Sequence, residues 1–314
     1  MNTFLNKLKA NHIYTYFFVK CSAFIVLFFM ADFAIGSVLN HFYGTQKKGW
    51  DYRTKYSIEN TTANVLLVGS SRVQQQYNPT FFEDRLHTTC YNAGRDGETF
   101  LYQYTLLQGV LNRYQPKAIV LECENNMFLK HPTSYERLSC LLPFYKNHAE
   151  MRPVLEKRSP FEKLKLFSQM YPYNSLLFKI VIGNISKGED EDIKGYVPLM
   201  GALQEPKRQV NFDKKYTMDS FKIQLFTQLV QQCTSKHIKL YLTCSPYFSD
   251  GYGNDQSLLL AKQIATKYTV PFIDLSKGHP LLQQSNLYDD TAHVNNIGSK
   301  ILSNIIVDSL LQYQ

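Results

Sequence analysis

The sequence predicts an α/β protein whose core is a three-layer α/β/α domain with a five-stranded parallel sheet. Short apolar runs of the buried-strand type alternate with longer segments of helical periodicity, and this alternation is typical of parallel βαβ units. The runs that we expect to form strands are residues 65–68, 88–91, 117–123, 239–244 and 270–275. Polar side chains follow several of these runs, at the sheet edge where open α/β sheets place their sites.

Each expected strand is followed, directly or after an insertion, by a segment of helical pattern. The expected helices are residues 79–86, 98–114, 218–236, 256–268 and 297–311. Pro116 ends the second of them, since proline cannot continue a helix. We expect these helices on both faces of the sheet, in a flavodoxin-like arrangement.

A long apolar stretch precedes this domain. Residues 21–39 carry one charge, that of Asp32, and are near the length that crosses a bilayer as a helix. Tyr14 and Tyr16 precede the stretch as interface aromatics. This predicts a retained signal anchor. A cleavable signal peptide remains the alternative, because small residues stand before Ser37 where a signal peptidase requires them.

The domain organisation follows from this anchor. We expect a cytoplasmic tail and transmembrane helix at 1–40, a stalk at 41–61 and the folded domain at 62–314. Lysines and arginines flank the span on both sides, so their number does not set its orientation. We expect the large domain outside the cytoplasm, because the short amino-terminal tail is easily left inside.

A helical insertion interrupts the strand and helix alternation at about 130–210. The insertion has prolines, among them Pro132, Pro143, Pro153, Pro160 and Pro172, between short helical patterns such as 161–170, and an acidic run at 189–192. Placed after the third strand, it could cover the carboxyl edge of the sheet as a lid. A packed helical addition without a part in catalysis is the alternative.

Charge and cysteine content exclude some classes of function. The net charge of +8 comes from basic residues that are scattered or flank the span, so we expect contact with lipid and no binding of nucleic acid. The six cysteines and eight histidines show no zinc-ligand spacing. We therefore expect neither a metal nor another cofactor.

An Asp-x-x-His step lies just before the last expected helix. Asp290 and His293 can lie on one side of a turn, so that the carboxylate accepts the imidazole N–H and fixes the tautomer that a general base needs. Such a pair needs a nucleophile, and Gly69-Ser70-Ser71 follows the first strand directly. Asp289 lies one residue off this spacing, and we expect it to be a solvated neighbour or a loop cap.

Two further strand ends carry candidate residues. Asn92-Ala93-Gly94 follows the second expected strand, and Glu124-Asn125-Asn126 follows the third. In this order of motifs the chain resembles the SGNH hydrolase superfamily, also called the GDSL esterases and lipases, which is named for a Ser, a Gly, an Asn and a His in four blocks. The resemblance covers residues 62–128 and 221–311.

The resemblance implies a catalytic triad. Gly-Ser-Ser stands where the family has Gly-Asp-Ser, so that Ser71 would be the nucleophile. His293 would be the general base and Asp290 its partner, and Gly298 matches the final block. Arg72, beside the nucleophile, is expected to pair with a surface carboxylate rather than with an anionic group of the substrate.

The resemblance also implies an oxyanion hole. Its donors would be the backbone N–H groups of Ser71 and Gly94 and the side-chain amide of Asn125. The third block departs from the family's Gly-x-Asn-Asp, so Asn126 remains the alternative to Asn125.

Within the superfamily the layout is similar to membrane-anchored bacterial proteins that edit or attach acyl groups on envelope polysaccharides. This implies a serine-dependent O-acyl ester hydrolase or O-acyltransferase, acting on acetyl esters of a cell-envelope carbohydrate. It would be a single-pass protein of the bacterial inner membrane with a periplasmic catalytic domain. The alternative is a catalytically silent SGNH-like domain that binds polysaccharide or a membrane acyltransferase partner.

Overall fold

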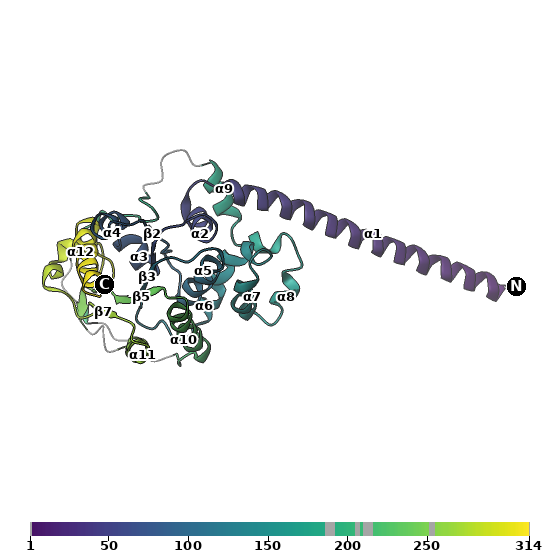
Figure 1. Ribbon diagram of the computed structural model, residues 1–314. Coiled ribbons are helices and arrows are strands. Elements are labelled where there is room, and N and C mark those ends of the chain that lie inside the picture. The colour runs from purple at the N-terminus through teal and green to yellow at the C-terminus, as the bar shows by residue number, and fades with distance from the viewer. Residues whose placement is uncertain (1, 186–191, 205–207, 210–215, 251–254, 314) are drawn as a thin grey trace. The chain divides into compact units, whose positions relative to one another are not determined.

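The computed structural model describes residues 2–185, 192–204, 208–209, 216–250 and 255–313 (Figure 1). The chain divides into two compact units. The α1 unit comprises residues 1–47 and 159–186, and the sheet unit comprises residues 48–158 and 187–314. Part of the expected insertion, including the acidic residues 189–191, lies outside the described residues.

The sheet unit contains the predicted five-stranded parallel sheet, in the order β2-β1-β3-β5-β7 (Figure 1). This confirms the predicted fold class. The strands are β1 (Val65–Val68), β2 (Cys90–Asn92), β3 (Ala118–Glu122), β5 (Lys239–Cys244) and β7 (Phe272–Asp274). β7 begins later than expected because the Val270 N–H is bonded to the end of the preceding helix, at Ala265 O, and Pro271 has no N–H to donate. A separate parallel pair joins β4 (Arg208–Gln209) to β6 (Ser249–Asp250).

Helices cover both faces of this sheet. α3 and α4 pack with α12, whereas α5 packs with α2 and α10, so that two helical layers enclose the strands. The helices are α2 (Gly49–Glu59), α3 (Ser71–Gln76), α4 (Pro79–Leu86), α5 (Phe100–Arg113), α10 (Ser220–Ser235), α11 (Gln256–Lys267) and α12 (Asn296–Gln312). Side chains cap several of them: Asn78, Asp219 and Asn295 each accept an N–H from the first turn of the helix that follows.

α2 occupies most of the segment that was expected to be a stalk. Its polar residues are buried because they pair: Asp51 accepts a 2.7 Å hydrogen bond from Arg95, and their side chains are 1% and 3% exposed. The helix packs against α5. In the structure these residues therefore belong to the packed sheet unit.

The insertion is divided between the two units. Its first part belongs to the sheet unit and contains α6 (Pro132–Glu136), η1 (Arg137–Phe144), η2 (Ala149–Met151), α7 (Arg152–Leu155) and η3 (Glu156–Arg158). The next part joins the long helix α1 (Asn2–Thr45) in the α1 unit and contains α8 (Glu162–Lys165), η4 (Tyr171–Tyr173) and α9 (Leu177–Ile185). α1 holds one stretch, Tyr14–Thr45, that is long and apolar enough to cross a membrane.

Candidate active site

The first strand delivers Ser71 to the start of a helix. β1 ends at Val68, and α3 begins at Ser71 after a two-residue turn. Glycine is required in this turn, because a Cβ at Gly69 would lie 2.2 Å from Val73 Cγ2. Ser70 caps the helix by accepting the Arg72 N–H. Ser71 is therefore held at the carboxyl edge of the sheet, where α/β folds gather functional side chains.

His293 lies in a tight loop between β7 and α12. The loop is closed by a bridge between Tyr288 and Val294, and by the Asp289 N–H, which donates to His293 O at 2.9 Å. The two 3₁₀ turns η5 (Pro280–Leu282) and η6 (Ser285–Leu287) precede it. At its far end Gly298 packs so closely that a Cβ would lie 2.3 Å from Leu287 O. This close packing explains why position 298, in the helix after the histidine, is occupied by glycine.

Ser71, His293 and Asp290 form a continuous hydrogen-bonded chain. Ser71 Oγ lies 2.8 Å from His293 Nε2, although 222 residues separate them. His293 Nδ1 lies 2.9 Å from Asp290 Oδ2 and 3.0 Å from Oδ1. An ionised carboxylate can only accept, so Nδ1 carries the proton and Nε2 is left to accept from Ser71.

The carboxylate of Asp290 is stabilised as an anion. Partial burial by itself would raise the pKa of this group, but the hydrogen bonds to the His293 ring and to the N–H groups of Ala292 and His293 lower the pKa below its ordinary value. Its side chain remains 54% exposed. Asp290 is therefore ionised at neutral pH.

Asp289 has a different partner. Its Oδ1 accepts the Gly201 N–H at 2.7 Å, and Leu203 N donates to Tyr288 O nearby. Asp289 thus fixes the insertion segment 192–204 to the histidine loop. This described part of the insertion lies beside the triad.

The expected oxyanion donor Gly94 is already engaged. Its N–H donates to Asn92 Oδ1 at 2.9 Å, and a Cβ there would lie 2.5 Å from Gln74 N. The structure therefore gives Gly94 a packing role, which differs from the expectation. The motif shows which residue is glycine but not which N–H is used.

Gly97 in the same loop carries a backbone N–H that differs from those of its neighbours. The N–H groups of residues 93–96 and 98 donate, in that order, to Leu67 O, Asn92 Oδ1, Gly69 O, Gln74 Oε1 and Arg95 O. Among the described residues, only the Gly97 N–H in this loop has no such acceptor. Its φ of +74° is a left-handed conformation that favours glycine. The sequence signal for it was the Asp-Gly pair, which is typical of such a turn position.

Asn125 is better placed than Asn126 for a side-chain donor. Asn126 is exposed at φ +62°, and its N–H donates to Asp255 Oδ1, so it serves as a turn residue. Both polar atoms of the Asn125 amide are buried and have no hydrogen-bond partner in the part of the chain that the structure describes. A buried amide without a partner is costly, and a ligand oxygen would accept a hydrogen bond from its Nδ2.

Arg72 is buried, which corrects the expectation of a surface pair. Its side chain is 4% exposed, and Nε lies 3.1 Å from Glu122 Oε1, whose side chain is 0% exposed. Its Nη1 donates to Ala292 O at 2.6 Å, and its guanidinium lies 3.7 Å from the Tyr247 ring centroid. This network links the helix of Ser71 to the loop of His293. Glu122, a charge that ends an otherwise apolar strand run, was the sequence signal for a buried partner.

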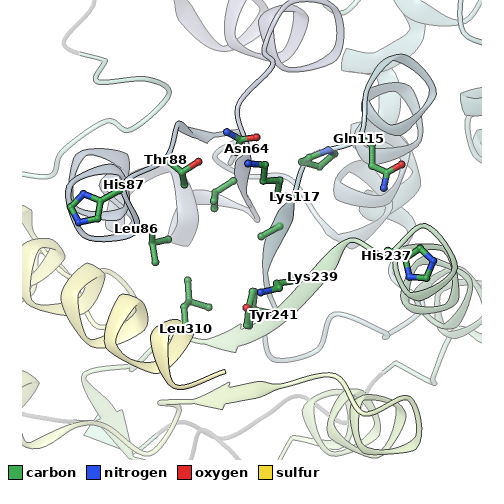
Figure 2. Close-up of a pocket in the computed structure, with 13 residues that line it drawn as sticks. Asn64, Leu86, His87, Thr88, Gln115, Lys117, His237, Lys239, Tyr241 and Leu310 are labelled. Atoms are coloured by element: carbon green, nitrogen blue, oxygen red, sulfur yellow. The ribbon is translucent and has the colours of Figure 1, made fainter. Parts of the chain in front are cut away.

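Not every cavity of the sheet unit lies at the triad. One of about 570 Å³ is lined by the amino ends of β1, β3 and β5, including Val65, Ala118 and Lys239 (Figure 2). Parallel strands carry their carboxyl ends at the opposite edge, where Ser71 begins α3. Size alone therefore does not locate the site, and the hydrogen-bonded triad is the better guide. Within the described residues no group of three His, Cys, Asp or Glu side chains could hold a metal ion.

Comparisons with known proteins give remote likenesses. No protein-family model and no curated protein matches the chain. Among solved structures it is similar to a proposed acylhydrolase from Bacteroides fragilis, with 13% identity and a TM-score of 0.41 over 85% of this chain and 99% of that one. A GDSL-like lipase from Bacteroides thetaiotaomicron has 10% identity and a TM-score of 0.41 over 85% and 100%. A lipase/acylhydrolase from Enterococcus faecalis has 12% identity and a TM-score of 0.37 over 78% and 94%. Sequence identities and TM-scores this low carry no information on chemistry, so the chemistry of this chain follows from its own residues.

Proposed function

We propose that this chain is a serine-dependent O-acyl ester hydrolase or O-acyltransferase of the SGNH type. The observation that carries the proposal is the 2.8 Å approach of Ser71 Oγ to a histidine whose other ring nitrogen is held by Asp290. A serine hydroxyl attacks an ester only when a base removes its proton, and this geometry provides that base. No residue of the triad requires a metal or a cofactor.

The proposed reaction has two halves. Ser71 Oγ attacks the ester carbonyl while its proton passes to His293 Nε2, and Asp290 stabilises the imidazolium. His293 then gives this proton to the leaving alcohol, and the acyl group stays on Ser71 as an ester. A second hydroxyl, from water or from a sugar, loses its proton to His293 and attacks the acyl carbonyl. The bond from the acyl group to Ser71 Oγ then breaks, and His293 returns the proton to Ser71 Oγ. Water makes the protein an esterase, and a sugar hydroxyl makes it an acyltransferase.

The negative oxygen of the tetrahedral intermediate needs donors. We assign them to the Ser71 N–H, the Gly97 N–H and the Asn125 amide, with Gly97 in place of Gly94. Removing one such donor typically lowers kcat by about 10²–10³. We expect this loss for Asn125→Ala, and little change for Asn126→Ala, because Asn126 is an exposed turn residue.

We further propose the substrate and location. Acetyl esters on a cell-envelope carbohydrate are the proposed substrates, at the periplasmic side of a bacterial inner membrane that α1 crosses once. The apolar helix supports the membrane crossing, because the side chains of Phe24, Phe28 and Phe33 are 62–70% exposed, as lipid-facing residues would be. A membrane acyltransferase is a proposed partner if the acyl group is transferred.

A catalytically silent, polysaccharide-binding domain is the second candidate. The observation behind it is that Asn92 already engages the N–H of the expected donor Gly94, so that catalysis depends on Gly97 taking the place of Gly94. The two candidates differ in whether acyl groups are turned over at Ser71. A silent domain would bind acetylated polysaccharide equally well as wild type and as Ser71→Ala, without hydrolysis by either.

Hydrolysis of a small acetyl ester by the detergent-purified full chain tests the proposal. We expect turnover of p-nitrophenyl acetate that falls by several orders of magnitude, roughly 10⁴ or more, in Ser71→Ala. Ser70→Ala is the matched control, because Ser70 is a helix cap whose loss costs about 1 kcal/mol of stability and no chemistry. Equal activity of Ser71→Ala and wild type would remove the nucleophile and with it the proposed function.

A further inference from the structure

The α1 unit pairs the apolar helix with a segment whose hydrogen bonds to it join residues 133 to 142 positions apart in the chain. η4 and α9, from residues 159–186, pack against α1. The contacts begin at Asp32, whose carboxylate accepts the Ser168 hydroxyl and the N–H groups of Gln169 and Met170. Gly36 allows a close approach here, because a Cβ at this position would lie 2.4 Å from Gln169 Cβ.

Further contacts continue along the same helix. Tyr173 donates to Asn40 Oδ1 at 2.8 Å, and Asn184 donates to Phe42 O while accepting from the Thr45 hydroxyl. At 1.5 Å per residue, the positions from Asp32 to Thr45 extend over roughly 20 Å of α1. The segment therefore follows α1 along the last part of the apolar stretch 21–39 and beyond its end.

Asp32 sets the depth of this contact. It lies inside the apolar stretch 21–39, about 10 Å along the helix from the end of that stretch. A carboxylate within a span is expensive unless partners satisfy it, and its partners must then reach the same depth. Here the partners are Ser168, Gln169 and Met170. If α1 crosses the bilayer, this turn enters it as well.

The outer surface of the segment is apolar. Its exposed side chains include Phe161, Leu164, Phe167, Phe178, Ile182 and Ile185, with exposed fractions from 58% to 86%. In α9 only Ile180 is buried. Exposed apolar side chains in this number mark an interaction surface, and amphipathic elements of this kind lie in the boundary between headgroups and acyl chains.

We propose that residues 159–185 form a second membrane-contacting element, which enters the bilayer beside α1 and buries its phenylalanines among the lipid acyl chains. The occupant of this surface is the bilayer that α1 crosses. The segment is continuous with the membrane span, because it is hydrogen-bonded to α1 at membrane depth. The inference rests on the membrane placement in the proposed function, and it adds a contact that a single-pass anchor does not have.

Lipid-dependent quenching of tryptophan fluorescence tests this element. The full-length chain has one tryptophan, so Trp50→Phe gives a silent background. Phe178→Trp and Phe167→Trp then report on the segment, Phe29→Trp on α1, and Leu281→Trp on a 61% exposed position of the sheet unit. Each variant is reconstituted into phosphatidylcholine vesicles with plain or brominated acyl chains.

We expect brominated lipid to reduce the fluorescence of Phe178→Trp and Phe167→Trp to an extent comparable with Phe29→Trp, and to leave that of Leu281→Trp unchanged. Quenching of Phe29→Trp alone would overturn the second element while leaving the anchor intact. Quenching of none of the four would remove the anchor itself, and with it the membrane placement in the proposed function. Equal quenching at Leu281→Trp would show that lipid contact is not specific to the segment and would also overturn the inference.

Discussion

Two carboxylates act on the loop that carries His293, and their surroundings are opposite. Asp290 is 54% exposed at its side chain and bonds the imidazole directly. Glu122 is 0% exposed and acts through Arg72, which donates to the carbonyl of Ala292, the residue before the histidine. The exposed pair, Asp290 and His293, sets the tautomer of the histidine. The buried pair, Glu122 and Arg72, sets the position of the histidine backbone. Chemistry and positioning are thus separated between two regions.

The largest effect is expected at the exposed pair. Asp290→Asn keeps the shape but offers an amide, which favours the wrong imidazole tautomer, so kcat should fall by on the order of 10⁴. Asp289→Asn is the matched control: its carboxylate bonds Gly201 rather than the histidine, and we expect a change of roughly a few-fold. The kcat of both variants on one soluble ester checks this, with folding verified by thermal melt. Equal losses would mean that the two carboxylates share the role.

The buried pair should affect stability more than chemistry. Glu122→Gln leaves the Arg72 charge without its partner in the interior, and breaking such a pair costs about 3–5 kcal/mol. Arg85→Met is the control, because its pair with Asp308 is exposed and should contribute at most about 1 kcal/mol. Urea denaturation of the three proteins compares their unfolding free energies. A cost for Glu122→Gln no larger than that for Arg85→Met would contradict the role of the buried network.

The smallest effect is the pH dependence of the exposed pair. Hydrogen bonds to His293 and Ala292 outweigh partial burial and depress the folded-state pKa of Asp290 below its ordinary 3.8. A depressed carboxyl pKa stabilises the folded state above the unfolded value, and this contribution disappears as the pH falls through the folded value. The difference in unfolding free energy between wild type and Asp290→Asn should therefore shrink as the pH falls below 3.8. A difference that stays constant down to the lowest pH would contradict the depressed pKa.

The sequence predicted the sheet because its strands are short apolar runs with polar ends, a local pattern. It also selected Ser71, Asp290 and His293, which the structure brings together, because their types and spacing are local signals. The buried role of Arg72 was not predicted, because its partner Glu122 is 50 residues away along the chain. Pairing between residues so far apart produces no periodic pattern in the sequence.

Two other features also depend on geometry that no pattern records. The choice of Gly97 over Gly94 turns on which N–H is already bonded. The association of residues 168–170 with Asp32 turns on a contact across 136 residues or more. Local signals therefore located the strand ends and the candidate triad, and long-range polar contacts had to be read from the structure.

The most direct test of the triad is covalent labelling of the full-length protein with a fluorophosphonate, followed by mass-spectrometric mapping of the modified residue. Such probes react with a serine whose proton is taken by a neighbouring base, so the account predicts modification of Ser71 in wild type and in Ser70→Ala. Labelling should be lost in Ser71→Ala and strongly reduced in His293→Ala, because the base lies 2.8 Å from the hydroxyl. Modification at Ser70, or labelling of Ser71 that does not depend on His293, would contradict the account.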